Sequence, residues 1–268
     1  MKFLLQTINE HFEYDFVFEM KKAIEYLKWR GDDVSVCYCD IDDLLNKSLY
    51  HEELKDYCPI GSIDFVYAFI DKYVKEDGSK EIKPLNVPEQ LFDFCGRKII
   101  NAELSNRINI ATLIEQNFYD CDGEYAFVKS MTNIKDEING PYKYTELLYN
   151  DIIPDGEYQI SEYCTEIDSE YRCFVFENQL LGIQFYQGDF TAFPNVDKIL
   201  EMIKRYSVSS PVAYTLDVAV TDDGDLIVIE CHEFFSCGLY GFRDYSRMPY
   251  MFWRTFLTIK RRLLNEQN

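Results

Sequence analysis

The sequence predicts an α+β fold, and three features of the 268-residue chain indicate it. Near the start, strand-like residues 2–8 and 34–39 flank a helical pattern over 14–29, an order typical of two parallel strands joined by a helix. Residues 214–234 read as a β-hairpin, because two apolar runs flank an Asp-Gly turn. Antiparallel pairing is indicated by three strand-like segments in close succession, at 157–164, 170–178 and 180–188.

The segment 74–90 divides these features, since it is polar and contains one Gly and two Pro. It suggests two domains, an N-terminal α/β domain at 1–95 and a second domain at 96–268. The apolar run IDFVYAFI is consistent with a third strand of the first domain. We expect four further elements: a helix over 103–117, a strand over 124–130, a helix capped by Asn195 that ends near Tyr206, and a closing helix over 243–264.

Two carboxylates interrupt the apolar runs of the hairpin. With a turn at Asp223-Gly224, Thr221 pairs with Leu226 and Asp217 pairs with Glu230, which places the two acidic side chains about 5 Å apart. They repel unless a proton or a cation lies between them, so amides at both positions are expected to stabilise the metal-free protein. The opposite face is predicted to be core, and consists of Leu216, Val218, Val220, Ile227, Ile229 and Cys231.

Strand alternation puts His232 on the same face as Glu230. Two carboxylates with an imidazole form a site that suits Mg²⁺, which prefers oxygen ligands. The alternative is an exposed hairpin whose acidic side chains only face water. The hairpin alone does not separate these two interpretations.

Composition excludes several classes of protein. A content of 47% hydrophobic residues argues against disorder, and a net charge of −20 argues against nucleic acid as the main partner. No apolar stretch approaches the roughly 18 residues of a membrane span. Nine scattered cysteines without a CxxC pair, and only three histidines, indicate reduced thiols in a cytoplasmic protein and not a zinc site. An acidic mimic of DNA remains an alternative.

Three basic residues stand out against this acidic background. Lys129 ends a strand and Lys135 lies in the polar loop beyond it, where both can hold phosphates or simply face solvent. Arg172 alternates with Phe174 and Phe176 along a strand, so it needs an anionic partner. That partner is either a ligand or the acid of a structural salt bridge.

The order of these pieces resembles the ATP-grasp superfamily, in particular the branch marked by one arginine and two lysines. The similarity covers roughly 96–268, and its most specific part is LDVAVTDDGDLIVIECHEFFSCGLYG. It implies an ATP-grasp-like fold with an N-terminal α/β (pre-ATP-grasp-like) domain. The family typically ends this hairpin with Glu-x-Asn, whereas this chain has Glu230-Cys231-His232.

The resemblance implies ATP and Mg²⁺ as cofactors, and a ligase that activates a carboxylate as an acyl-phosphate for attack by an amine. Its substrates are unknown and include peptides or proteins as candidates. A non-catalytic nucleotide-binding or inhibitory protein is the alternative. For the nucleotide, the resemblance assigns Lys129 and Lys135 to the phosphates, the main chain of Glu162, Tyr163 and Cys164 to adenine, and Asp168 to the ribose. For catalysis and metal binding it assigns Arg172 to the transferred phosphate, with Lys135 beside it, and Asp217, Glu230 and His232 to Mg²⁺.

Overall fold

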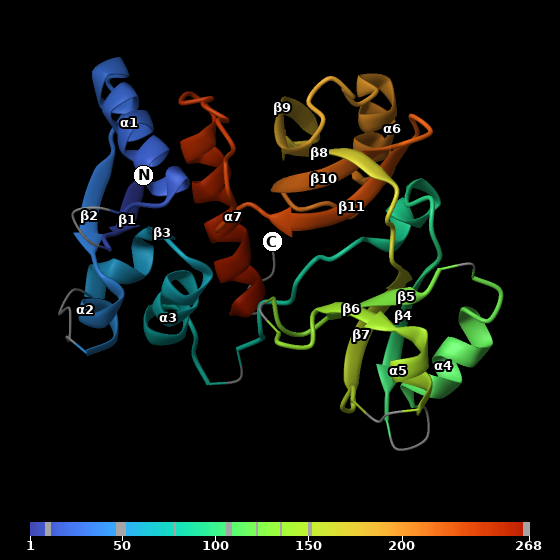
Figure 1. The fold of residues 1–268 in the computed structure, drawn as a ribbon. Coiled ribbons are helices and arrows are strands. Elements are labelled where there is room, and N and C mark those ends of the chain that lie inside the picture. The colour runs from blue at the N-terminus through green and yellow to red at the C-terminus, as the bar shows by residue number, and fades with distance from the viewer. Residues whose placement is uncertain are drawn as a thin grey trace.

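A computed structural model describes residues 1–8, 12–46, 52–77, 79–105, 109–121, 123–134, 136–149 and 152–264. They form three β-sheets with helices packed against them, which confirms the predicted α+β class (Figure 1). Within these residues, no helix has the length and apolar character needed to cross a membrane.

The first sheet is parallel, with β1 (Lys2–Gln6) between β2 (Ser35–Cys39) and β3 (Cys58–Ile60). Helix α1 (Asp15–Arg30) joins β1 to β2, so the predicted parallel pair is confirmed. Two short helices connect β2 to β3, namely α2 (Ile41–Asn46) and η1 (Glu52–Asp56).

The predicted strand at 63–70 is wrong, because these residues lie in helix α3 (Ile63–Tyr73). Ser62 caps the helix by accepting a hydrogen bond from the Phe65 amide at 3.2 Å. The buried side chains follow a helical spacing, at Phe65, Val66, Phe69 and Ile70.

The second sheet is antiparallel, in the order β4-β7-β5-β6, and α4 and α5 cover it. The predicted helix at 103–117 is only partly right, since its first residues belong to β4 and the helix begins after Asn109, which caps it. The short helix η2 (Glu89–Phe94) precedes this sheet. The elements are β4 (Ile99–Leu104), α4 (Ile110–Asn117), β5 (Tyr125–Ser130), β6 (Gly140–Lys143), α5 (Tyr144–Tyr149) and β7 (Gly156–Glu162).

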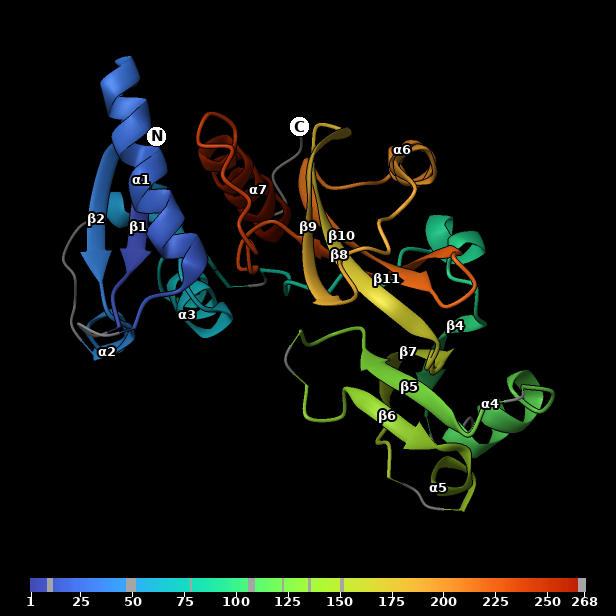
Figure 2. The same ribbon diagram turned by 45° about the horizontal axis from the view of Figure 1, so that its top comes forward.

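The third sheet is also antiparallel, in the order β11-β10-β8-β9. The predicted pairing of β8 with β9 is confirmed, whereas β7 does not pair with β8 and belongs to the second sheet. Figure 2 shows the two four-stranded sheets one above the other, joined by the chain between β7 and β8. The elements are β8 (Ile167–Phe176), β9 (Gln179–Gly188), α6 (Val196–Tyr206), β10 (Ala213–Thr221) and β11 (Leu226–Glu233).

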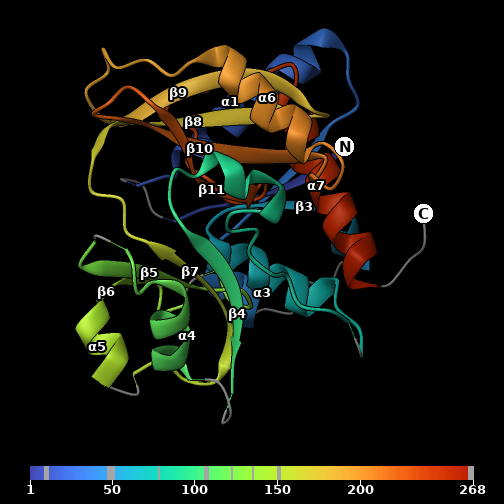
Figure 3. The same cartoon turned by 90° about the vertical axis from the view of Figure 1, so that its right-hand side faces the viewer.

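Helix α7 (Met248–Leu263) confirms the predicted closing helix and connects the first and third sheets. It contacts α1, β3 and β10, and its buried side chains share one core with the N-terminal residues (Figures 1 and 3). The chain's last helix therefore packs beside its first strands. The division into 1–95 and 96–268 stays a prediction.

Candidate functional site

Asp217 in β10 and Glu230 in β11 lie directly opposite each other, as predicted. Nearer the turn, however, the pairing differs by one residue from the expected one. Val220 pairs with Leu226, so the expected pair of Thr221 with Leu226 is wrong. The Gly224 amide instead donates to the Thr221 carbonyl at 2.8 Å, so the turn begins at Thr221. The loop therefore takes one residue more from the β10 side than expected.

A β-bulge at Ile229 restores the register. Val228 faces Val218 and Glu230 faces Asp217, so Ile229 is the extra residue between them. The changed register puts Ile227 and Ile229 on the same face as Glu230, so their predicted face is wrong; Ile227 is nevertheless buried, as predicted, whereas Ile229 is only partly buried. Leu226, Val228 and Cys231 occupy that core instead.

Arg97 stabilises the bulge, although the sequence did not single it out. Its guanidinium donates to the Val228 carbonyl at 2.8 Å and to the Ile229 carbonyl at 3.4 Å. A bulge disrupts the regular ladder, so its carbonyls need other donors. Arg97 therefore helps to fix the position of Glu230.

Arg172 pairs with Asp217 across β8 and β10. Its Nε and Nη2 donate to the two carboxylate oxygens at 2.8 and 2.6 Å, and its Nη1 donates to the Gly238 carbonyl at 3.1 Å. Asp217 is only 1% exposed. Burial raises the pKa of Asp217 and Arg172 opposes this shift, so the charge of this carboxylate depends on the guanidinium.

Glu230 contacts two basic side chains. Lys129 of β5 forms an ion pair with one carboxylate oxygen, and His232 Nε2 lies 2.6 Å from the other. Burial opposes ionisation of Glu230, but His232 and Lys129 lower its pKa well below the usual range. Separate basic side chains thus offset the expected repulsion between the two acids. Arg172 pairs with Asp217, and Lys129 and His232 contact Glu230.

Asp217, Glu230 and His232 can offer one ligand atom each, and these atoms lie within 4.8 Å of one another. Two carboxylates with an imidazole fit a divalent cation, since hard oxygen donors suit Mg²⁺ and imidazole suits softer metals. A metal ion at this position would compete with Lys129 for Glu230.

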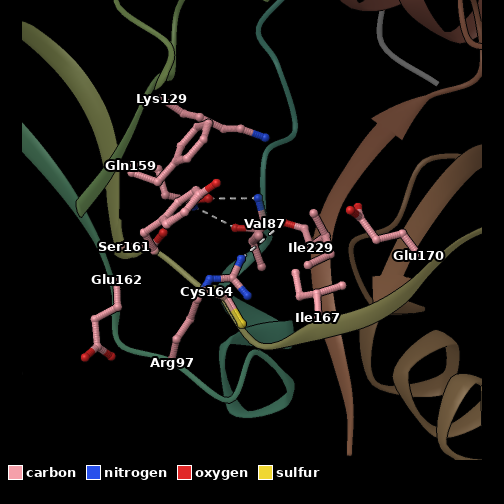
Figure 4. A pocket seen from close by; sticks show the side chains of 12 residues that line it. Val87, Arg97, Lys129, Gln159, Ser161, Glu162, Cys164, Ile167, Glu170 and Ile229 are labelled. Atoms are coloured by element: carbon pink, nitrogen blue, oxygen red, sulfur yellow. Dashed lines mark hydrogen bonds between the residues drawn. The ribbon is translucent and has the colours of Figure 1, made fainter. Parts of the chain in front are cut away.

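A cavity of about 230 Å³ lies between the second and third sheets, beside these charged groups. Figure 4 shows Lys129 extending across it toward Ile229, whereas the carboxylate of Glu162 points away from the other side chains. That carboxylate accepts a hydrogen bond from the Lys98 amide at 2.7 Å. The lining consists of Val87, Arg97, Phe127, Lys129, Gln159, Ser161, Glu162, Tyr163, Cys164, Ile167, Glu170 and Ile229.

The structure places four of the predicted site residues in the lining of this cavity. Lys129, Glu162, Tyr163 and Cys164 line it. Asp168 does not, but lies on a neighbouring cavity that shares the lining residues Tyr163 and Cys164. Lys135 lies outside the described residues.

Two polar residues that the sequence did not reveal tie the cavity walls together. Gln159 of β7 exchanges two hydrogen bonds with the main chain of Val87, at 3.0 and 2.9 Å. Asn86 accepts from the Cys231 amide at 2.8 Å and donates to the Ser130 carbonyl at 3.0 Å. The 86–87 segment thereby links the third sheet to the second. No local sequence pattern predicts contacts between residues so far apart in the chain.

A second cavity of about 200 Å³ lies on the other side of Arg172 and His232. Ile63 of α3 and Lys83 line it together with residues 235–238. The charged cluster thus adjoins two cavities, one between the four-stranded sheets and one facing the N-terminal part. Arg172 lines the second cavity, and Lys129, at the other end of the cluster, lines the first.

Comparison with known proteins agrees with this geometry. Residues 94–248, more than half of the chain, match the model of a family described as the ATP-grasp domain, R2K clade family 2. No curated protein matches the chain.

Solved structures with a similar fold include the D-cycloserine synthetase DcsG, with a TM-score of 0.54 at 11% identity over 96% of this chain and 100% of that one. The ATP-grasp ligase PsnB complexed with a minimal precursor gives a TM-score of 0.51 at 11% identity, over 93% of this chain and 97% of that one. At this identity the similarity shows a shared fold.

Proposed function

This chain belongs to the ATP-grasp domains of R2K clade family 2, and from that premise we propose that it is an ATP- and Mg²⁺-dependent ligase. In this proposal the cavity between the four-stranded sheets binds ATP. A carboxylate is activated as an acyl-phosphate and is then attacked by an amine, which forms an amide or peptide bond.

One observation carries the proposal: Lys129 lines a cavity and is linked through the Glu230–Asp217 pair to Arg172, and about half of the cavity's other lining residues are apolar. Ile167, Ile229 and Phe127 offer contacts for a flat base, while the cations suit phosphates. A net charge of −20 would repel ATP elsewhere, so a local group of cations is needed for binding.

The proposed roles follow from these positions and, for Lys135, from the resemblance to the family alone. Lys129 and Lys135 hold the phosphates, the main chain of Glu162, Tyr163 and Cys164 lies against adenine, and Asp168 reaches the ribose from the neighbouring cavity. Asp217, Glu230 and His232 hold the metal. Mg²⁺, when bound, supplies positive charge for the phosphate oxygens. Arg172 neutralises the charge of the transferred phosphate.

The two chemical steps need little covalent help from the protein. First, a substrate carboxylate oxygen attacks the γ-phosphorus and ADP leaves. The amine nitrogen then attacks the acyl carbon and inorganic phosphate leaves. The chain's residues orient the reactants and stabilise negative charge during both steps.

Nucleotide binding is tested by thermal unfolding with ATP at millimolar Mg²⁺. At 100-fold excess over Kd a ligand stabilises the fold by about 2.7 kcal/mol, which for a chain of this size is roughly 5–10 °C. We expect Lys129→Met to remove most of this shift, because it removes a phosphate contact. Lys143→Met is the matched control, since Lys143 is exposed on β6, outside the cavity. Equal shifts in both variants, or no shift in the unmodified protein, contradict the proposal.

A non-catalytic nucleotide-binding or partner-binding protein is the second candidate. His232 favours it, because this residue stands where the family typically has an asparagine and forms a hydrogen bond with Glu230. The two candidates differ in turnover. A ligase releases ADP and phosphate only when a carboxylate and an amine are both present, whereas the non-catalytic protein binds ATP without release under every co-substrate condition.

A further inference from the structure

Two cavities lie end to end along helix α3. The inner one is the cavity of about 200 Å³ at Arg172 and His232, and a further cavity of about 270 Å³ lies beyond it. The same three segments line both, namely one face of α3, residues 81–85 and residues 132–134. The rings of Tyr67 and Phe235 stack where the two cavities meet, with their centroids 6.4 Å apart. Because neighbouring residues of these segments line the two cavities, we treat them as one groove that leads away from the charged cluster.

The inner end of this groove suits a carboxylate. Arg172 has five N–H donors and uses three of them within the described structure, so two are available to a ligand. Lys83 also lines this end, with its ammonium paired to Glu157 at 2.8 Å, so Arg172 is the group that offers donors to a carboxylate. The acid in this lining, Glu233, is already paired with Arg262 through two hydrogen bonds of 3.1 and 2.7 Å.

The outer end has the opposite character. Asp71 and Glu81 both pair with the single ammonium of Lys75, at 2.8 and 2.5 Å, which leaves an excess negative charge. The Tyr67 hydroxyl is buried there without a hydrogen-bond partner among the described residues. A buried polar group of this kind is costly unless a ligand or water satisfies it. The outer end therefore suits a cationic group that also carries hydrogen-bond donors.

The separation of the two ends sets the length of the ligand. Ile63 lines the inner cavity and Asp71 the outer one, eight residues further along α3. A rise of 1.5 Å per residue places them about 12 Å apart along the helix. An extended peptide spans about 3.3–3.6 Å per residue, so three to four residues cover this distance.

We propose that this groove binds an extended peptide whose carboxylate lies at Arg172 and whose cationic group lies at Asp71 and Glu81, three to four residues away. The proposal rests on the proposed ligase function only for the fate of that carboxylate, which is the group to be activated. Binding itself depends on the groove. The cation is either a lysine or arginine side chain or a free amino terminus.

The test measures peptide binding by isothermal titration calorimetry, with and without Mg²⁺ and a non-hydrolysable ATP analogue. The probes are Lys-Ala-Ala-Ala, its acetylated form, tetra-alanine, acetyl-tetra-alanine and Lys-Ala-Ala-Ala amide. We expect Lys-Ala-Ala-Ala, which carries both cations and the carboxylate, to bind at least tenfold more tightly than acetyl-tetra-alanine and the amide. Comparing acetyl-Lys-Ala-Ala-Ala with tetra-alanine distinguishes the side chain from the terminus as the cation. The dipeptide Lys-Ala is expected to lose the preference because it is too short.

The Asp71→Asn/Glu81→Gln variant should lose the preference for a cation and keep the thermal shift with Mg²⁺ and ATP. Glu25→Gln/Glu201→Gln is the control with the same change of charge, because both residues are exposed on helices outside the groove. Equal binding of acetyl-tetra-alanine and Lys-Ala-Ala-Ala overturns the proposal, whatever the nucleotide does. Loss of the nucleotide shift with retained peptide selectivity would refute the ligase and leave the groove intact.

Discussion

Asp217 and Glu230 occupy positions of a hairpin that would normally hold apolar side chains, and the structure shows what compensates them. Arg172 binds both oxygens of Asp217, while Lys129 and His232 bind the two oxygens of Glu230. Each carboxylate thus has its own partners, which come from other strands as well as from the hairpin. The buried charges are tolerated because they are paired and hydrogen-bonded.

This pairing reverses the sign of the expected effect of the two amides. Asp217→Asn with Glu230→Gln would relieve little repulsion and would leave the buried Arg172 guanidinium without a carboxylate. We expect the double variant to lose about 3 kcal/mol or more of unfolding free energy, the range for breaking a buried ion pair. Urea denaturation of the metal-free protein measures this loss.

Asp225→Asn is the matched control for that measurement. Asp225 is exposed and lies 4.0 Å from Lys198, so its replacement should change the unfolding free energy by less than about 0.5 kcal/mol. A double variant as stable as the unmodified protein would show that Arg172 and Asp217 do not form the buried pair described here.

The residues of the candidate site could be picked out from the sequence, whereas most of their contacts could not. Lys129, Arg172, Asp217 and Glu230 stand out because charged residues interrupt or end apolar strands. Arg97 and its contact with the bulge left no such signal, because a basic residue after a glycine looks like an ordinary surface residue. Contacts between residues far apart in the chain, such as this one, depend on how the sheets pack.

At the scale of elements, amphipathic spacing predicted the helices α1, α6 and α7 and most strands of the third sheet. It failed at 63–70, because a short continuous apolar run is compatible with both a strand and a buried helix. The bulge at Ile229 was also hidden, since the run Leu226 to Ile229 is apolar at every position and offers no alternation to read. Register and length of such runs are decided by tertiary contacts.

The close approach of Gly188 to strand β8 leads to a prediction about the β8–β9 pair. Gly188 ends β9 with φ +91°, and a Cβ atom there would lie 2.0 Å from the Asp168 carbonyl oxygen. Gly188→Ala should therefore destabilise the β8–β9 pair by about 2 kcal/mol or more, since left-handed backbone alone costs roughly 1–2 kcal/mol. Urea unfolding of the variant checks this value.

Gly140→Ala provides the comparison, because Gly140 begins β6 and a Cβ atom there meets nothing within 4 Å. We expect it to remain within about 1 kcal/mol of the unmodified protein. If the two alanine variants were equally stable, the close approach at Gly188 would be wrong.

At the scale of the whole molecule, a strongly acidic chain gathers several of its basic residues in one place. The chain carries a net charge of −20, yet Arg97 and Lys129 line the cavity between the second and third sheets, and Arg172 lies next to it on Asp217, which faces Glu230. Three separate segments supply them, and residues 86–87 tie the cavity walls together. The packing of the sheets therefore brings these basic residues close together.

The central claim is that this cavity binds ATP with a metal on the hairpin carboxylates. The most direct measurement is a crystal structure of the protein grown with Mg²⁺ and a non-hydrolysable ATP analogue. We predict the base between Ile229 and the main chain of residues 162–164, the metal on Asp217 and Glu230, and Lys129 moved from Glu230 to a phosphate. A nucleotide bound elsewhere, or an empty cavity with Lys129 still on Glu230 at millimolar ligand, would contradict the account.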